Sequence, residues 1–182
     1  MFASRRSLST FLALALCASP AVARTQSLAI GAAAGATIPS SGFGDRTNMG
    51  YHVMVTLGVH APMVPLSFRI EGMYNEFDYN SDQGALFRSA NRTARVLGAT
   101  ANGVFTSSGL LGPYLIGGVG LYQTTEARPV FGGTVGSNNV GANIGGGFRF
   151  GLSGFSAYAE ARYHWVGDSD VRIIPITFGL TF

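Results

Sequence analysis

The sequence predicts an all-β fold, an eight-stranded antiparallel up-and-down β-barrel. Three observations lead to it: apolar and polar residues alternate with a period of two, the alternating segments are joined by alternately short and long connections, and the composition is unusual. Of 182 residues only 12% are charged, while glycine is present 26 times and phenylalanine 13 times. Low charge with many aromatic and glycine residues favours strands over helices.

The N-terminal segment, residues 1–23, has the three parts of a secretory signal peptide. Arg5 and Arg6 form a basic start, an apolar run follows at residues 11–18, and residues 21–23 read Ala-Val-Ala, a small-x-small cleavage pattern. The apolar run is too short to cross a bilayer, which requires roughly 20 residues. We therefore expect cleavage after residue 23 and a barrel domain over residues 24–182.

Removal of this segment changes what the mature chain can do. The only cysteine, Cys17, is lost with it, so neither a disulfide nor a thiol nucleophile remains. Loss of the two arginines lowers the formal charge from +3 to +1, and the chain contains no lysine. A nearly neutral chain has no electrostatic footprint for nucleic acid.

Each predicted strand is an alternating segment of about 10–14 residues, long enough for a tilted crossing of a bilayer. In residues 155–165 one face is wholly apolar with aromatic ends, and the other carries both signs of charge. The faces of residues 27–38 and 113–125 are not assigned, because small residues occupy both. The predicted strands are residues 27–38, 51–60, 66–75, 93–106, 113–125, 142–150, 155–165 and 174–182.

The connections alternate in length along the chain. Short ones are expected at residues 61–65, 107–112 and 151–154; longer ones at 39–49, 80–92 and 126–138, with a brief one at 167–171. An even number of strands, with short turns at one end and longer loops at the other, is typical of bacterial outer-membrane barrels. Closure also satisfies every backbone polar group, as lipid requires.

A soluble barrel that encloses a ligand in an apolar interior is the competing fold. Three features favour an apolar face turned outward to lipid: lysine is absent, aromatic residues recur at strand ends, and opposite charges share one face two residues apart. These charges predict an ion-pair network in the lumen, formed by Arg69, Glu71, Arg149, Glu160 and Arg162.

The chain resembles the OmpA/OmpX-like family of eight-stranded outer-membrane β-barrel domains. The segments that carry the resemblance are PYLIGGVGLY (113–122), GGGFRFG (145–151), AYAEARYHW (157–165) and ITFGLTF (176–182). It implies a place in the cell outer membrane and contact with outer-membrane lipids and lipopolysaccharide. The outer loops could also bind a surface ligand, which the sequence does not identify. It also implies insertion by the barrel-assembly machinery, which reads a C-terminal strand ending in an aromatic. That signal would comprise Ile174, Ile176, Phe178, Leu180 and Phe182.

Some eight-stranded barrels are enzymes that modify lipid A, and such an activity would require a catalytic grouping of side chains. His164, Asp168 and Ser169 are triad residue types, but a strand rising about 3.3 Å per residue keeps them apart unless the chain bends back. His52 and His60 lie about 26 Å apart along one strand, too far for one metal ion. The acidic residues of the outer loops could bind divalent cations, although such loops are usually only solvated. They are Asp45, Asp78, Asp82, Asp168 and Asp170.

We therefore expect a structural or surface-interacting barrel with no catalytic site, metal or cofactor. An eight-stranded barrel is narrow enough for its own side chains to fill, so a wide pore is not expected. A lipid A-modifying outer-membrane enzyme and a soluble secreted ligand-binding barrel are the alternatives.

Overall fold

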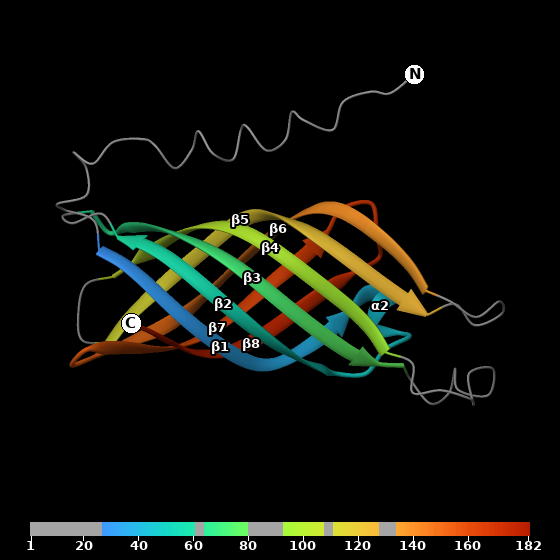
Figure 1. The fold of residues 1–182 in the computed structure, drawn as a ribbon, viewed down its shortest axis with the longest axis horizontal. Helices are drawn as coiled ribbons and strands as arrows, with labels where there is room; N and C mark the ends of the chain where they lie inside the picture. The colour runs from blue at the N-terminus through green and yellow to red at the C-terminus, as the bar shows by residue number, and fades with distance from the viewer. Residues whose placement is uncertain (1–26, 61–63, 80–92, 108–110, 128–133) are drawn as a thin grey trace, which may run out of the picture.

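The computed structural model describes residues 27–60, 64–79, 93–107, 111–127 and 134–182. Eight antiparallel strands form a closed barrel in chain order, and the last strand pairs with the first (Figure 1). This confirms the predicted fold. The expected signal peptide lies outside the described residues. The elements are β1 (Ser27–Ser40), α2 (Ser41–Gly44), β2 (Gly50–His60), β3 (Leu66–Asp78), β4 (Thr93–Thr106), β5 (Leu111–Ala127), β6 (Thr134–Leu152), β7 (Phe155–Val166) and β8 (Arg172–Thr181).

The barrel has two unlike ends. One, here called the turn end, carries the start of β1, the C-terminus and the connections at residues 61–65, 107–110 and 153–154 (Figure 1). The other, the loop end, carries α2 and the connections at residues 45–49, 79–92, 128–133 and 167–171. No helix in the described part of the chain is long and apolar enough to cross a membrane.

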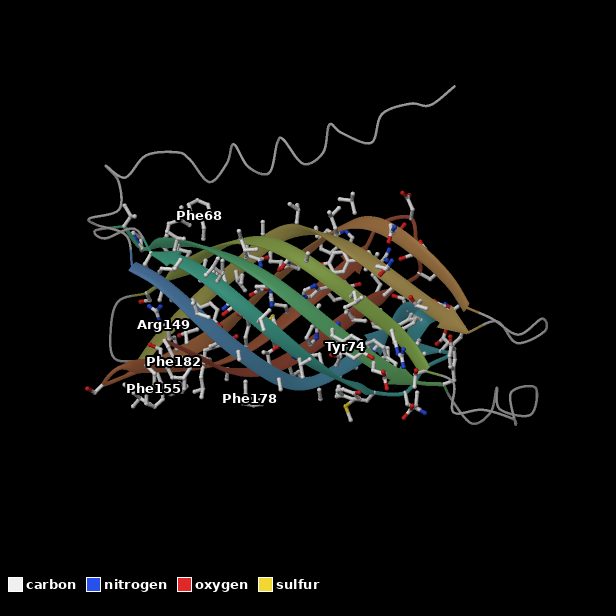
Figure 2. The ribbon with its side chains drawn as sticks, in the orientation of Figure 1. Phe68, Tyr74, Arg149, Phe155, Phe178 and Phe182 are labelled. Atoms are coloured by element: carbon white, nitrogen blue, oxygen red, sulfur yellow. The ribbon has the colours of Figure 1, made fainter. Side chains whose placement is uncertain are left out.

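The apolar face of the strands is the outer face of the barrel. In β2, His52, Met54 and Thr56 are buried in the lumen, whereas Val53 and Val55 are exposed. The same alternation runs through β3, β4 and β7, and the side chains of Phe68 and Phe178 point away from the wall (Figure 2). The apolar side chains therefore do not enclose a ligand cavity, which excludes the soluble-barrel alternative.

Aromatic side chains form a band near each end of this apolar wall. Tyr51, Tyr74, Tyr163 and Trp165 face outward toward the loop end, and the rings of the last two are 6.0 Å apart. The turn-end band consists of phenylalanines, with the Phe155 and Phe182 rings 6.1 Å apart (Figure 2). Its members are Phe68, Phe105, Phe150, Phe155 and Phe182. Two aromatic bands flanking an apolar belt are typical of barrels in lipid.

The two strands whose faces the sequence left unassigned, β1 and β5, turn glycines into the lumen. An added Cβ at Gly35 would lie 1.9 Å from the carbonyl oxygen of Ile176, and one at Gly118 would lie 2.1 Å from that of Ala101. No side chain fits at such distances, so glycine is required there. The lumenal face of β5 also holds Ile116, opposite the outward Leu115 and Val119. Both faces of these strands thus consist largely of small or apolar residues, and they lack the polarity contrast that reveals a face.

The prediction of a longer connection at residues 126–138 is wrong. β5 runs to Ala127 and β6 starts at Thr134, and the two remain paired from Gln123 with Asn138 to Ala127 with Thr134. Cross-strand pairing uses backbone groups, so polar residues can extend a hairpin beyond the apolar belt. The short helix α2 was not predicted either; it places Phe43 inside the barrel.

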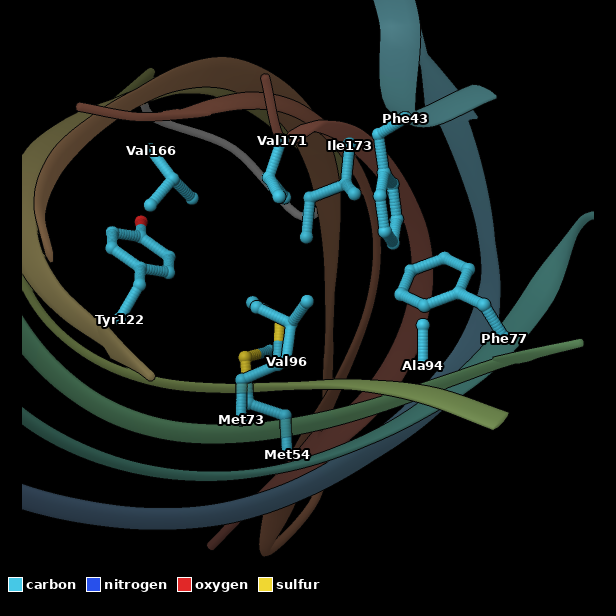
Figure 3. Close-up of a cluster of buried hydrophobic side chains, with 10 residues drawn as sticks. All are labelled: Phe43, Met54, Met73, Phe77, Ala94, Val96, Tyr122, Val166, Val171 and Ile173. Carbon is cyan, nitrogen blue, oxygen red and sulfur yellow. The ribbon is translucent and has the colours of Figure 1, made fainter. Parts of the chain in front are cut away.

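A hydrophobic plug fills the lumen at the loop end (Figure 3). Phe43 from α2 packs edge-on against Phe77, with ring centroids 5.1 Å apart, and both are fully buried. The plug consists of Phe43, Met54, Met73, Phe77, Ala94, Val96, Tyr122, Val166, Val171 and Ile173. The loop end is thus closed by packed apolar side chains.

The packing of the lumenal glycines is testable with two neighbouring positions. Gly118→Ala places a methyl group against the Ala101 carbonyl, and we expect a loss of about 1–3 kcal/mol in the free energy of unfolding. Gly103→Ala on the outer face meets no atom closer than 4.0 Å and should change stability little. Urea unfolding of both variants in detergent measures the difference, and equal stabilities would contradict the facing of β4 and β5.

Candidate functional site

Four charged side chains meet at the centre of the lumen. Arg69 and Glu71 come from β3, and Glu160 and Arg162 come from β7. Each strand supplies an arginine and a glutamate two residues apart, which the period-two alternation places on the same inward face. Because β3 and β7 are not neighbours in the barrel, these contacts cross the lumen and join separated parts of the wall.

The four groups form a closed ring of alternating charge, here called the lumenal ring. Arg69 contacts Glu71, with Nε 2.5 Å from Oε1, and also contacts Glu160. Arg162 Nη1 is 2.7 Å from Glu71 Oε2, and its Nε is 2.6 Å from Glu160 Oε1. Each arginine therefore meets both glutamates, and the formal charges cancel within the ring.

Neutral polar side chains surround the glutamates. Glu71 Oε2 accepts hydrogen bonds from Thr100 Oγ1 and Asn102 Nδ2, each at 3.0 Å. Asn143 Nδ2 donates to Asn102 Oδ1 at 2.9 Å, and Tyr114 donates to Glu160 Oε2 at 2.7 Å. Side chains from β4, β5 and β6 thereby bond, directly or through one another, to the charged groups of β3 and β7.

Burial makes this arrangement sensitive to the loss of any member. Glu71, Glu160 and Arg162 are 3%, 4% and 2% exposed, so each charge has lost nearly all its contact with water. Such ions are tolerated when opposite charges and hydrogen bonds replace the water. Arg69 has further support, since its guanidinium carbon lies 5.3 Å from the Tyr158 ring centroid and 6.0 Å from that of Tyr114.

Two histidines, here called the histidine layer, lie on the loop-end side of the lumenal ring among the residues of the plug. His52 is one inward position beyond Met54 on β2, and His164 is one inward position before Val166 on β7. His52 Nδ1 and Nε2 each lie 2.9 Å from a hydroxyl, those of Thr37 and Thr177. His164 Nδ1 lies 2.9 Å from the Tyr122 hydroxyl. In the described part of the chain no three His, Cys, Asp or Glu side chains are grouped to hold a metal ion. His60, at the far end of β2, is not part of this layer.

The three triad residue types do not assemble. His164 is buried in the lumen with Tyr122, whereas Ser169 Oγ bonds the backbone of its own turn, at Val166 O and Val171 N. Asp168 is exposed in that turn with a φ of 54°. Of the other acidic residues, Asp78 and Asp170 lie exposed at the loop end, Asp45 follows α2, and Asp82 lies outside the described residues.

Arg149, the fifth residue expected in the network, lies apart from the lumenal ring. On β6 the residue beside Glu160 is Gly147, and the residue beside Arg162 is Gly145; Arg149 is beside Tyr158, one inward position nearer the turn end. It forms no ion pair with a described residue. Figure 2 shows it close to the end of the barrel that holds Phe155 and Phe182.

Sequence reasoning missed several groups that hold the site. Thr100, Asn102 and Asn143 were on or beside predicted inward positions, and alternation could have nominated them. Tyr114 is on β5, whose faces were unassigned. Phe43 is the only aromatic residue of the first loop, and nothing periodic marked it as a lumenal residue.

Removing one charge from the lumenal ring should leave a buried partner uncompensated. We expect Glu160→Gln to lower the free energy of unfolding by about 3 kcal/mol while the protein still inserts. The double variant Glu160→Gln/Arg162→Gln should cost less than the sum of its single variants, because it removes opposite charges together.

The exposed pair of Glu76 and Arg95, 3.0 Å apart, provides the matched control. Glu76→Gln should cost about 1 kcal/mol or less, since water reaches both side chains and Arg95 is largely exposed. Urea unfolding in detergent gives the free energy of unfolding of the parent protein and of each of these variants. Equal losses at positions 76 and 160 would show that the lumenal ring does not stabilise the barrel.

Known structures share this fold at low sequence identity. Neisserial surface protein A aligns with a TM-score of 0.66 and 16% identity over 86% of this chain and 97% of that one. A major outer membrane protein from Thermus thermophilus aligns with a TM-score of 0.68 and 12% identity over 86% and 98%. Ail of Yersinia pestis aligns with a TM-score of 0.51 and 16% identity over 86% and 97%. No curated protein sequence matches the chain.

The sequence itself carries a family signature over almost its entire length. The profile of the outer membrane protein beta-barrel domain matches residues 9–182. The outward apolar belt, the two aromatic bands and the closed eight-stranded barrel agree with that match. The chain belongs to the outer membrane protein beta-barrel domain family, and its place is the cell outer membrane.

Proposed function

We propose that this protein is a closed, non-catalytic outer-membrane barrel that presents its loop end to the cell exterior for interaction with surface ligands. The observation that carries this proposal is the filled lumen. The plug, with the two histidines packed among its residues, and the lumenal ring together fill the barrel interior from the loop end to its centre. With transport through the interior blocked, the loop end is the part left to meet extracellular partners.

The loop end offers a polar surface raised above the apolar belt. The β5–β6 hairpin continues past the last apolar residues, and Gln123, Ser137 and Asn138 are exposed on it. Arg46 approaches Glu126 at 3.8 Å, which links the first loop to this hairpin. Ail has been crystallised in complex with the heparin analogue sucrose octasulfate, and that precedent supports ligand binding by such a barrel as the role to test.

Lipopolysaccharide contact fits a hollow on the outer wall near the loop end. The hollow, about 560 Å³, is lined by the apolar Leu97, Leu121 and Val140 and by the amides Gln123 and Asn138. On β5 and β6 the amides are one outward position nearer the loop end than Leu121 and Val140. Apolar residues below amides match a lipid whose acyl chains and sugar head occupy those two levels. We propose this wall as the contact with outer-leaflet lipid.

Orientation and closure can be tested together. The chain's only cysteine lies in the expected signal peptide, so introduced cysteines report without background. A membrane-impermeant maleimide should label Ser137→Cys on intact cells, whereas Ser153→Cys at the turn end should react only after lysis. In planar bilayers the purified protein should show no stable channel. Labelling of position 153 on intact cells, or a steady conductance, would refute the proposal.

The C-terminal strand supports the proposed role of the barrel-assembly machinery. Ile176, Phe178, Leu180 and Phe182 are exposed on the outer wall of β8, and Ile174 is partly exposed at its start. These outward apolar side chains, which end on an aromatic residue, would be accessible before β8 pairs with β1.

Phe182 and Phe155 make a matched pair for testing this signal, since both are exposed and their rings are 6.1 Å apart. Phe182→Ala should lower the amount assembled in cells about tenfold, and Phe155→Ala should not. Both should refold into detergent with similar yield, because each removes one phenylalanine ring from the same band. Equal assembly of the two variants in cells would mean that Phe182 acts only as part of the aromatic band.

A further inference from the structure

A small cavity lies in the lumen at the turn end, on the far side of the lumenal ring from the plug. Its volume is about 70 Å³, and its lining includes His60, Arg69, Arg149 and Tyr158. A single water requires about 10–15 Å³ on the same measure, so the cavity has room for a group of several heavy atoms.

The lining of this cavity is basic and contains no carboxylate. Arg69 is already balanced, because it contacts both glutamates of the lumenal ring. Arg149 has no acidic partner among the described residues, so its charge is an excess that the protein leaves at this place. An excess cation beside hydroxyl groups in a partly enclosed space attracts an anion.

Tyr158 supplies the second, independent observation. The residue is 4% exposed, and its hydroxyl is buried without a hydrogen-bond partner in the described structure. A buried hydroxyl without a partner costs free energy, so such groups usually face a ligand or an ordered water. Gly179 makes room for it, since an added Cβ there would lie 2.6 Å from the Tyr158 hydroxyl oxygen.

We propose that this cavity binds a small oxyanion of the phosphate class at the turn end of the barrel. Arg149 supplies the charge and Tyr158 donates a hydrogen bond from the lining of the cavity. A guanidinium suits an oxyanion because it donates two parallel hydrogen bonds to two oxygens. The site is separate from the loop end and does not depend on the surface role proposed above.

The first experiment measures phosphate binding to the full mature barrel in a nonionic detergent by isothermal titration calorimetry. Inorganic phosphate should bind saturably at one site, and chloride at the same ionic strength should not. Arg149→Gln should weaken binding about tenfold or more, and Tyr158→Phe by about threefold to tenfold, as expected for a charge-assisted and a neutral hydrogen bond. Arg95→Gln, at the exposed pair near the loop end, is the control and should bind as the parent does.

A phosphate group could come from the free ion or from a phospholipid headgroup, so a second titration uses dihexanoyl phosphatidylglycerol. Binding of inorganic phosphate without binding of the lipid would assign the site to the free ion. Binding of the lipid without binding of inorganic phosphate would assign it to a headgroup, provided that Arg149→Gln abolishes the binding. Urea unfolding of each variant checks that the barrel is intact. Saturable binding by neither compound, or binding that survives both substitutions in folded protein, would overturn the proposal.

Discussion

The lumenal ring is the constraint to which the rest of the interior conforms. Its two halves come from β3 and β7, which share no backbone hydrogen bonds, so the ring spans the barrel where the sheet cannot. Four buried charges are stable only if each remains paired. The barrel must therefore hold a narrow cross-section at this level, and the neighbouring strands must supply donors or leave space.

The space is left by glycine. Gly145 and Gly147 on β6 stand beside Arg162 and Glu160, and a Cβ at either would lie 2.2 or 2.3 Å from a backbone carbonyl oxygen of β7. The donors come from β4 and β5 as Thr100, Asn102 and Tyr114. The high glycine content and the charged lumen are thus linked. Large charged side chains fit inside the barrel because the neighbouring strands carry glycine at the adjacent inward positions.

This dependence explains what the sequence could and could not predict. Strands with contrasting faces, such as β3 and β7, were predictable because lipid selects one face and the ring the other. Arg69, Glu71, Glu160 and Arg162 followed from that contrast. The level of a residue along the axis is set by the stagger between strands, which a single sequence does not contain. Arg149 therefore shared the pattern of the ring but lies nearer the turn end.

Polarity changes along the axis in a way that suits a two-sided membrane. At the loop end Phe43 folds back from α2 into the plug, where apolar packing excludes water without any charge. At the turn end the lumen holds His60 and Arg149 beside a small cavity, where water or an ion can reach them. The lumenal ring lies between these regions, and its two arginines and two glutamates sum to zero formal charge. The loop end is therefore sealed by packing, while the turn end keeps an unbalanced cation in contact with solvent.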